Sequence, residues 1–178
     1  MRQTLILHPG STCEAVSWIH VEFSRPDPAR LKLHYKLGGY IGDLLIPDHA
    51  APVRAEGLWR HMCFELFLRA ADEDGYLEFN FSPSTQWAAY RFSGYRAAIG
   101  DAPDRCQPRI RFVSGSNGLA LMAEIDGLPE RDWHLGLSAV IEEGGGAKSY
   151  WALAHPPGDP DFHHETCFAL ELPAAESP

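Results

Sequence analysis

The sequence predicts an all-β protein, a sandwich or barrel of antiparallel strands with few helices. Apolar and polar residues alternate with a period of two over many short runs, as in half-buried strands. Turn-forming sequences separate these runs at short intervals. No window of 12 or more residues carries the 3.6-residue period of an amphipathic helix. The length of 178 residues fits one domain, 1–178, with roughly ten strands.

Strand-like runs follow one another through the first half of the chain. In the run that begins at Met62, Phe64 and Leu66 point to one side and Glu65 to the other. The turn sequence DEDG ends this run and opens the next, so we expect a hairpin there. The runs of this half are 16–23, 30–39, 62–70, 75–83 and 86–92.

The second half continues the same pattern. The sequence SGSNG, residues 114–118, separates two alternating runs and is typical of a hairpin turn. The C-terminal residues 173–178, PAAESP, should form a loose tail. The runs of this half are 108–113, 119–126, 134–143, 149–155 and 167–172.

Charge and the termini restrict the function and the location. A net charge of -9 argues against binding of nucleic acid or of an anionic membrane, both of which require a positive field. The first 15 residues lack the apolar segment of a signal peptide, and no apolar run is long enough to span a membrane. We therefore expect a soluble, cytoplasmic protein. Its four cysteines are widely and irregularly spaced, so we expect free thiols.

Residues 63–92 contain the most informative pattern. Tight turns should make the strands near residues 64, 79 and 90 antiparallel neighbours. Glu65, Glu78, Asn80 and Arg91 would then share one sheet face. The opposite face would belong to the core and would carry Phe64, Leu66, Phe79, Phe81, Tyr90 and Phe92.

Two interpretations of this polar face remain open. If loops cover it, the charges must pair, and an Arg91 fork on Glu78 or Glu65 would form a structural ion-pair network. If instead the polar face lines a cleft, it would form a ligand site. Trp87 has the same strand parity as Arg91 and would add a flat apolar ring beside the polar groups. Such a mixture suits a sugar, which has hydroxyls at its rim and C–H groups on its faces.

Other residues suggest metal or haem chemistry, each with a simpler structural alternative. His155, His163 and His164 are clustered, but their spacing matches no zinc pattern, and a solvated loop accounts for them. His61 and Met62 are a pair able to ligate haem iron, although alternation directs Met62 into the core. The acidic residues of 71–75 could bind calcium or form a solvated hairpin tip.

The segments LWRHMCFELFL, YLEFNFSPSTQWAAYRF and SYWALAHP resemble the DOMON-like domains related to type 9 carbohydrate-binding modules. The resemblance covers roughly residues 15 to 172 and is densest over 58–92. It implies a jelly-roll-like β-sandwich that binds a ligand. Relatives in this family bind sugars by aromatic stacking, or bind haem through a methionine and a histidine. By position, Glu65 and Glu78 match the family's acidic strand positions, and Trp59, Trp87 and Trp151 are candidate stacking residues.

We therefore predict a non-catalytic module that binds a small molecule or an oligosaccharide on an aromatic and polar sheet face, without a required cofactor. A b-type haem-binding domain is one alternative, and a glycosidase-like enzyme using Glu65 and Glu78 is another. The sequence leaves the ligand and the oligomeric state open. The predicted ligand-binding residues are Trp59, Glu65, Glu78, Asn80, Trp87, Arg91, Trp151 and His155.

Overall fold

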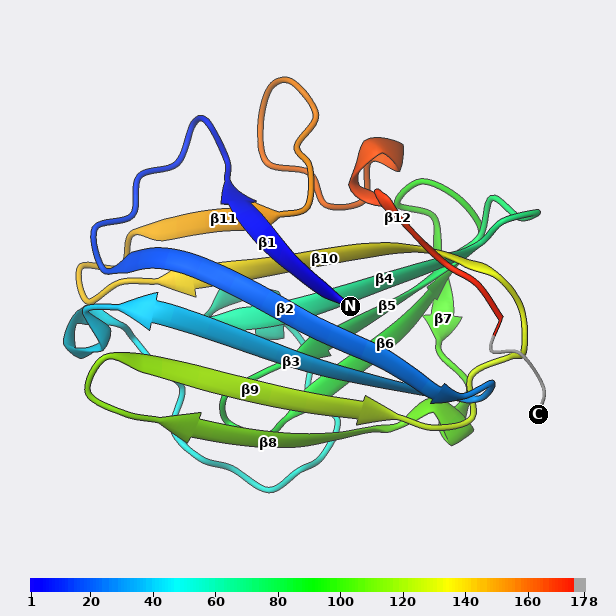
Figure 1. The fold of residues 1–178 in the computed structure, drawn as a ribbon, viewed down its shortest axis with the longest axis horizontal. Coiled ribbons are helices and arrows are strands. Elements are labelled where there is room, and N and C mark those ends of the chain that lie inside the picture. Colours follow the sequence, from blue (N-terminus) through cyan, green and yellow to red (C-terminus); the bar gives the residue numbers. More distant parts are fainter. Residues whose placement is uncertain (175–178) are drawn as a thin grey trace.

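In the computed structural model, which describes residues 1–174, the chain is built almost entirely from antiparallel strands (Figure 1). Short 3-10 turns η1 (Ile41–Asp43), η2 (Leu58–Arg60), η3 (Asp104–Cys106) and η4 (Glu165–Cys167) are the helical segments of the described residues. None of these turns has the length and apolar character needed to cross a bilayer. The strands are β1 (Arg2–Leu7), β2 (Val16–Asp27), β3 (Arg30–Gly39), β4 (Cys63–Ala70), β5 (Tyr76–Phe81), β6 (Trp87–Phe92), β7 (Ala98–Asp101), β8 (Pro108–Ser114), β9 (Gly118–Ile125), β10 (Trp133–Glu142), β11 (Lys148–Ala152) and β12 (Leu170–Leu172).

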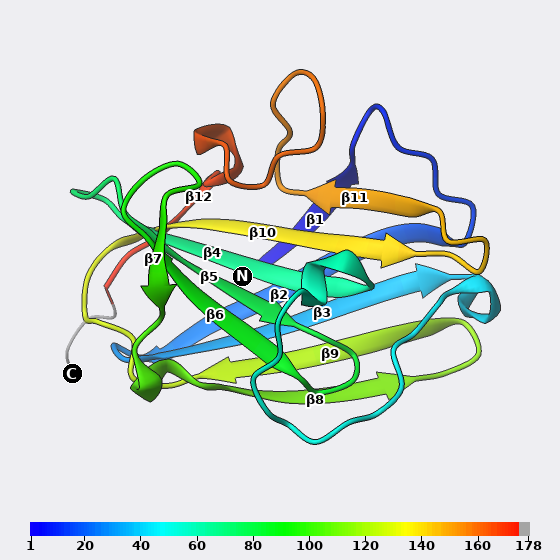
Figure 2. The same ribbon diagram turned by 180° about the vertical axis from the view of Figure 1, so that it is seen from behind.

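The strands form one curled sheet that folds over itself into two layers (Figures 1 and 2). The front layer contains β1, β2, β3, β9 and β8, in that order. The back layer contains β11, β10, β4, β5, β6 and β7, and β12 pairs with β10. Strand β1 joins the layers, because Arg2–Leu5 pair with β2, and Ile6 and Leu7 pair with β11. The predicted all-β, sandwich-like class is confirmed.

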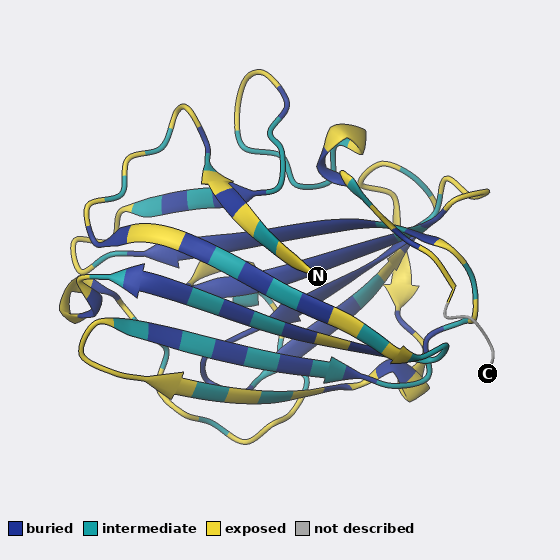
Figure 3. Cartoon of the chain, viewed as in Figure 1, coloured by how far each residue is buried: buried dark blue, intermediate teal, exposed yellow. Residues whose placement is uncertain are grey.

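The hydrophobic core lies between the two layers. In β9, buried residues alternate with partly exposed ones (Figure 3). Leu121 and Ile125 therefore face inward, while Glu124 faces solvent. From the back layer, Phe64 and Phe79 meet this surface. Burial of side chains of this size contributes roughly 1.5–3 kcal/mol each, which makes this interface the main source of stability.

The middle strands of the back layer, β10, β4 and β5, are buried on both faces. Every residue of β5 is buried, and Figure 3 shows β10 and β4 almost entirely in the colour of buried residues, whereas the edge strand β7 is exposed. A second apolar cluster explains this, because Phe67, Tyr76, Phe92 and Phe168 pack together on the outer face of the layer. Phe168 belongs to the segment after β11, which therefore covers part of this outer face.

Several local predictions are confirmed, and two strands were not foreseen. The DEDG turn joins β4 to β5, and the SGSNG turn joins β8 to β9. All four cysteines are free thiols, as expected. Strands β1 and β7 were not predicted from the sequence. Most of the expected C-terminal tail, 175–178, lies outside the described residues.

Candidate ligand-binding surfaces

The strand register brings three predicted site residues together on the outer face of the back layer. Glu65 pairs with Asn80 across β4 and β5, and Glu78 is the next outward residue of β5. Ser138 of β10 lies opposite Glu65 on the other side. We call Glu65, Glu78, Asn80 and Ser138 the acidic cluster. The prediction that Glu65, Glu78 and Asn80 share a face is confirmed.

Arg91 and Trp87 do not belong to this face, and the prediction that they do was wrong. Glu78 pairs with Tyr90 across β5 and β6, so the neighbours of the acidic cluster in β6 are the even-numbered residues. Trp87 instead pairs with Phe81 and points toward the core. Arg91 shares the parity of Trp87 and is exposed near the end of the strand. For the same reason, Tyr90 and Phe92 lie on the outer face rather than in the main core.

The acidic cluster is buried and satisfied by hydrogen bonds without any arginine. Glu65 is 3% exposed and Glu78 is 6% exposed. The Ser138 hydroxyl donates to Glu65 Oε2 at 2.9 Å, and Asn80 Nδ2 donates to Glu78 Oε1 at 2.6 Å. Burial, and then the neighbouring Glu78, raises the pKa of Glu65 to about 8. Burial raises the pKa of Glu78 to about 6. At neutral pH Glu65 is therefore held mostly in its neutral form.

Residues 54–61, which we call the strap, cross the outer face of the back layer (Figure 2). The strap lies over β6 at one end, where the Tyr90 hydroxyl donates to Glu56 Oε2 at 2.7 Å. Its η2 turn contacts β5 and β4. At the other end His61 Nδ1 lies 3.1 Å from Glu142 Oε2 of β10. The strap thus spans four neighbouring strands of the back layer.

Residues 153–168, which we call the C-terminal loop, cover the same face from the other side. His163 Nδ1 shares a 2.7 Å hydrogen bond with the Tyr76 hydroxyl, and its Nε2 lies 3.7 Å from Glu78 Oε2. His163 also packs edge-on against Phe67 and Phe92. Burial, and then Arg96, lowers the pKa of His163 to about 4. The prediction of a solvated histidine loop is therefore wrong for His163, which is largely covered by these contacts and whose lowered pKa favours the neutral form.

This arrangement limits the chemistry of the acidic cluster. Two carboxyl groups whose pKa values are pushed apart are the pattern of a general acid and base pair. Here, however, the strap and the C-terminal loop leave Glu65 and Glu78 almost inaccessible to a substrate. Residues 1–174 contain no group of three or more His, Cys, Asp or Glu arranged to hold a metal ion. Met62 is enclosed in the core while His61 is exposed, so these two side chains do not converge on one iron.

The remaining predicted residues are scattered. Trp151 faces the core and donates through Nε1 to Ser149 Oγ at 3.0 Å, so it offers no stacking surface. His155 is held at the edge of β1, with Nε2 at 2.9 Å from the Ile6 carbonyl oxygen. Trp59 lies on the strap, 51% exposed, with the Arg60 guanidinium 5.2 Å from its ring centroid. Only Trp59 of these three presents an open aromatic surface.

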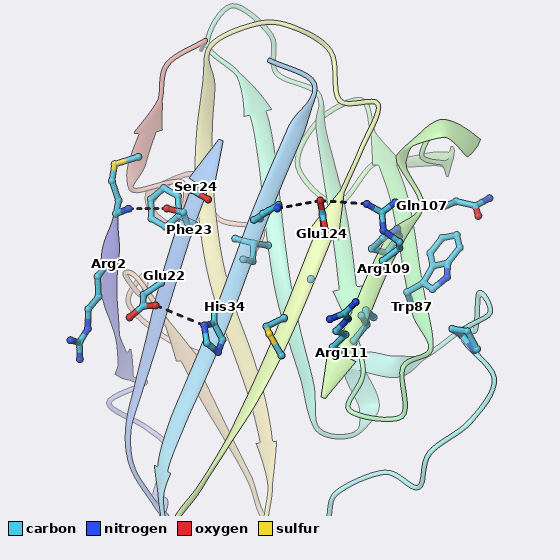
Figure 4. A pocket seen from close by; sticks show the side chains of 18 residues that line it. Arg2, Glu22, Phe23, Ser24, His34, Trp87, Gln107, Arg109, Arg111 and Glu124 are labelled. Atoms are coloured by element: carbon cyan, nitrogen blue, oxygen red, sulfur yellow. Dashed lines mark hydrogen bonds and ion pairs between the residues drawn. The ribbon is translucent and has the colours of Figure 1, made fainter. Parts of the chain in front are cut away.

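A second candidate surface, an open concavity, lies on the solvent face of the front layer (Figure 4). We call it the front hollow, and its volume is about 1260 Å³. One row of residues crosses it in register, from Arg2 of β1 to Arg111 of β8. We call this the central row, and it consists of Arg2, Glu22, His34, Met122 and Arg111.

A second row and one aromatic residue complete the front hollow. The second row contains Ser24, Lys32, Glu124 and Arg109. Trp87 lines the hollow beyond the edge strand β8 (Figure 4), and Pro52 and Gln107 line it as well. Trp87 is thus the one predicted site residue that reaches this surface. The other residues of the front hollow were not predicted from the sequence, because charged residues that alternate with core residues look the same on any solvated sheet.

A smaller hollow of about 610 Å³ opens at the end of the sandwich. Arg91, Arg131 and Trp133 line it together with the β4–β5 turn. The Arg131 guanidinium covers Trp133 at 5.7 Å from the ring centroid and pairs with Glu73 at 2.6 Å. Trp133 is also buried, at 5% exposed, so it offers a ligand little aromatic surface, and the front hollow is the better candidate site.

Comparisons with known proteins agree on the fold. No protein-family model matches this chain, and no curated protein matches it in sequence. A candidate carbohydrate-binding protein from Bacteroides uniformis superimposes with a TM-score of 0.62 at 12% identity, over 94% of this chain and 83% of that chain. A family 9 carbohydrate binding module from Caldicellulosiruptor kristjanssonii in complex with glucose gives a TM-score of 0.52 at 12% identity, over 84% and 72%.

The same module in complex with cellotriose gives a TM-score of 0.51, again at 12% identity, over 84% of this chain and 70% of that chain. Each match extends over most of both chains, so the likeness concerns the whole sandwich rather than one hairpin. The chain therefore shares its fold with family 9 carbohydrate binding modules.

Proposed function

We propose that this protein is a non-catalytic carbohydrate-binding module, a DOMON-like domain related to the family 9 modules, and that the front hollow receives the ligand. The observation that carries the proposal is the hollow itself, an open concavity of about 1260 Å³ on a rigid sheet face. A site on a sheet is held in place by backbone pairing, so its side chains are already arranged for binding. This reduces the entropy cost of binding.

The chemistry of the front hollow suits a sugar. His34, Glu22 and Lys32 offer donors and acceptors to hydroxyl groups. Met122, in the middle of the central row, gives an apolar contact for C–H groups. Small-molecule sites combine apolar surface with a few placed polar groups in this way.

The fold comparison supports the same ligand class. The solved family 9 modules are complexes with glucose and with cellotriose. At 12% identity this likeness concerns the fold, so the site in this chain rests on its own residues. The acidic cluster predicted from the sequence is the competing location, with the exposed Trp59 on the strap above it.

Binding of glucose and cellotriose, followed by calorimetry and by amide chemical shifts, tests both the function and the location. We expect shifts at Glu22, His34 and Met122, and we expect His34→Ala to weaken binding about tenfold. Trp59→Ala is the matched control on the competing face and should bind like the wild type. Shifts confined to the strap and β5 would move the site to the acidic cluster. Absence of binding across a panel of neutral and acidic oligosaccharides would contradict the proposed function.

A further inference from the structure

We infer that the front hollow selects an acidic sugar, and that Arg111 binds its carboxylate or sulfate group. The inference rests on the proposed function and deepens it by naming the ligand class. It follows from the charge of the hollow, from the pairing of its ionic groups, and from the position of Arg111.

The front hollow is positive in a protein that is strongly negative. The chain carries a net charge of -9. Four basic side chains line the hollow, against the two carboxylates Glu22 and Glu124. The basic side chains are Arg2, Lys32, Arg109 and Arg111. An acidic protein that gathers positive charge in one open hollow concentrates an anionic ligand there.

The two acids of the hollow are already occupied. Glu22 pairs with Lys36 at 2.8 Å and approaches His34 at 3.8 Å. Glu124 is shared by three cations at 3.4 to 3.6 Å, namely Arg30, Lys32 and Arg109. Both carboxylates are therefore already paired with other cations, and within the described part of the chain neither forms an ion pair with Arg111.

Within the residues that the structure describes, Arg111 is one of two basic side chains of the hollow that this network leaves unpaired, the other being Arg2. Arg111 is exposed, and among residues 1–174 it forms no ion pair. Its neighbour across the strand pair is Met122, which offers no charge. Its neighbour two residues away, Arg109, is held by Asp126 at 2.7 Å. A guanidinium fork without a partner matches the two oxygens of a carboxylate or a sulfate.

The position of Arg111 fits a bound sugar. Figure 4 shows Arg111 and Arg109 side by side on β8, with Trp87 beyond them and His34 toward the middle of the hollow. A sugar ring placed between His34 and Arg111 would rest on Met122 and direct an acidic substituent to the guanidinium. Arg2 is the other basic side chain of the hollow that has no ion pair within residues 1–174. It lies about 19 Å from Arg111 across four strand spacings, at the far end of the central row. A longer acidic chain would reach both.

Matched probes separate this inference from the proposed function. The probes are cellotriose, cellotriose with its C6 hydroxyls oxidised to carboxylates, and cellotriose sulfated at C6. We expect both acidic probes to bind at least tenfold more tightly than cellotriose at low salt, and to weaken as salt rises. The stronger of the two acidic probes identifies carboxylate or sulfate as the preferred group.

Variants test the role of Arg111. Arg111→Ala should remove most of the preference for the acidic probes, and Arg111→Lys should retain part of it. Arg60→Ala removes an exposed arginine outside the hollow and should bind like the wild type. Thermal melts identify any variant that is unfolded, and Arg111→Met then replaces Arg111→Ala.

Each outcome decides between the two claims. Equal binding of neutral and acidic probes would overturn the inference and leave the proposed function in place. An acidic preference that survives in Arg111→Ala would overturn the role of Arg111. Equally tight binding of a single-stranded oligonucleotide of matched charge would indicate a general polyanion surface and would also overturn the inference. If no probe binds, the proposed function fails, and the inference fails with it.

Discussion

The Glu65 carboxyl group makes the stability of the protein depend on pH. Its folded pKa is about 8, above the ordinary value of 4.5, because burial disfavours the charged form. The stability that the neutral form contributes is complete below pH 4.5 and is lost as the pH rises through about 8. Glu65→Gln should therefore remove much of the fall in unfolding free energy across this window, on the order of 3 kcal/mol.

Chemical denaturation at intervals from pH 4.5 to pH 8.5 measures this effect. The glutamine carbonyl can still accept the Ser138 hydrogen bond, so the variant should match the wild type at low pH and exceed it at pH 8. Glu14→Gln, at an exposed position, should follow the wild-type pH dependence. A Glu65→Gln variant that loses stability with pH as steeply as the wild type would show that Glu65 does not ionise in this range.

The His163 imidazole gives stability the opposite pH dependence, because its contribution is lost as the pH falls. Its folded pKa is about 4, below the ordinary 6.5, because burial disfavours the imidazolium form. The stability that the neutral imidazole contributes is fully present above pH 6.5 and is lost as the pH falls through about 4. His163→Gln should make the protein less sensitive to acid between these values, by on the order of 1–2 kcal/mol. An unchanged acid transition in denaturation experiments would contradict this assignment.

Residue parity shows what the sequence could and could not predict at this scale. Alternation in β4 and β5 correctly placed Glu65, Glu78 and Asn80 together. In β6 the assignment failed, because both faces of this strand carry apolar residues. Five residues connect Phe81 to Trp87, and one of them, Thr85, has a left-handed backbone with φ of 77°. The conformation of this connection decides whether the odd-numbered or the even-numbered residues of β6 face the core. The alternation of apolar and polar residues does not reveal that conformation.

At the scale of elements, Arg54 anchors the strap to the edge of the back layer. Its guanidinium donates to the Ala89 carbonyl oxygen, pairs with Asp101 of β7 at 2.7 Å, and lies 5.5 Å from the Trp87 ring centroid. Arg54→Ala should lower the free energy of unfolding by about 2 kcal/mol. Arg54→Lys should recover less than half of this, because an ammonium group lacks the planar fork.

Hydrogen exchange locates this effect in the strap. Amides of residues 54–61 should lose protection in Arg54→Ala, while those of β9 keep theirs. Arg60→Ala, on the same strap but exposed, should change stability by less than about 0.5 kcal/mol. Comparable losses in both variants would mean that charge on the strap, rather than the Arg54 contacts, stabilises it.

The sequence predicted most strands but missed β1 and β7, for a physical reason. In β1 only Leu5 is buried, and every residue of β7 is exposed. A strand that buries one face produces alternation, whereas one that contributes mainly backbone pairing does not. The front hollow was missed for a related reason, since its rows form only when five separate strands align in register.

At the scale of the whole molecule, β1 links the two layers by backbone pairing on both of its edges. Removing residues 2–7 would leave β2 and β11 with unpaired edges and would expose the core beside Leu5. We expect the melting temperature to fall by about 10 °C or more, with aggregation on heating. The control is the double variant Thr4→Ser and Ile6→Thr, which changes only exposed side chains and keeps the backbone pairing of β1. It should melt within a few degrees of the wild type. A deletion variant that melts like the wild type would mean that core packing alone holds the layers together.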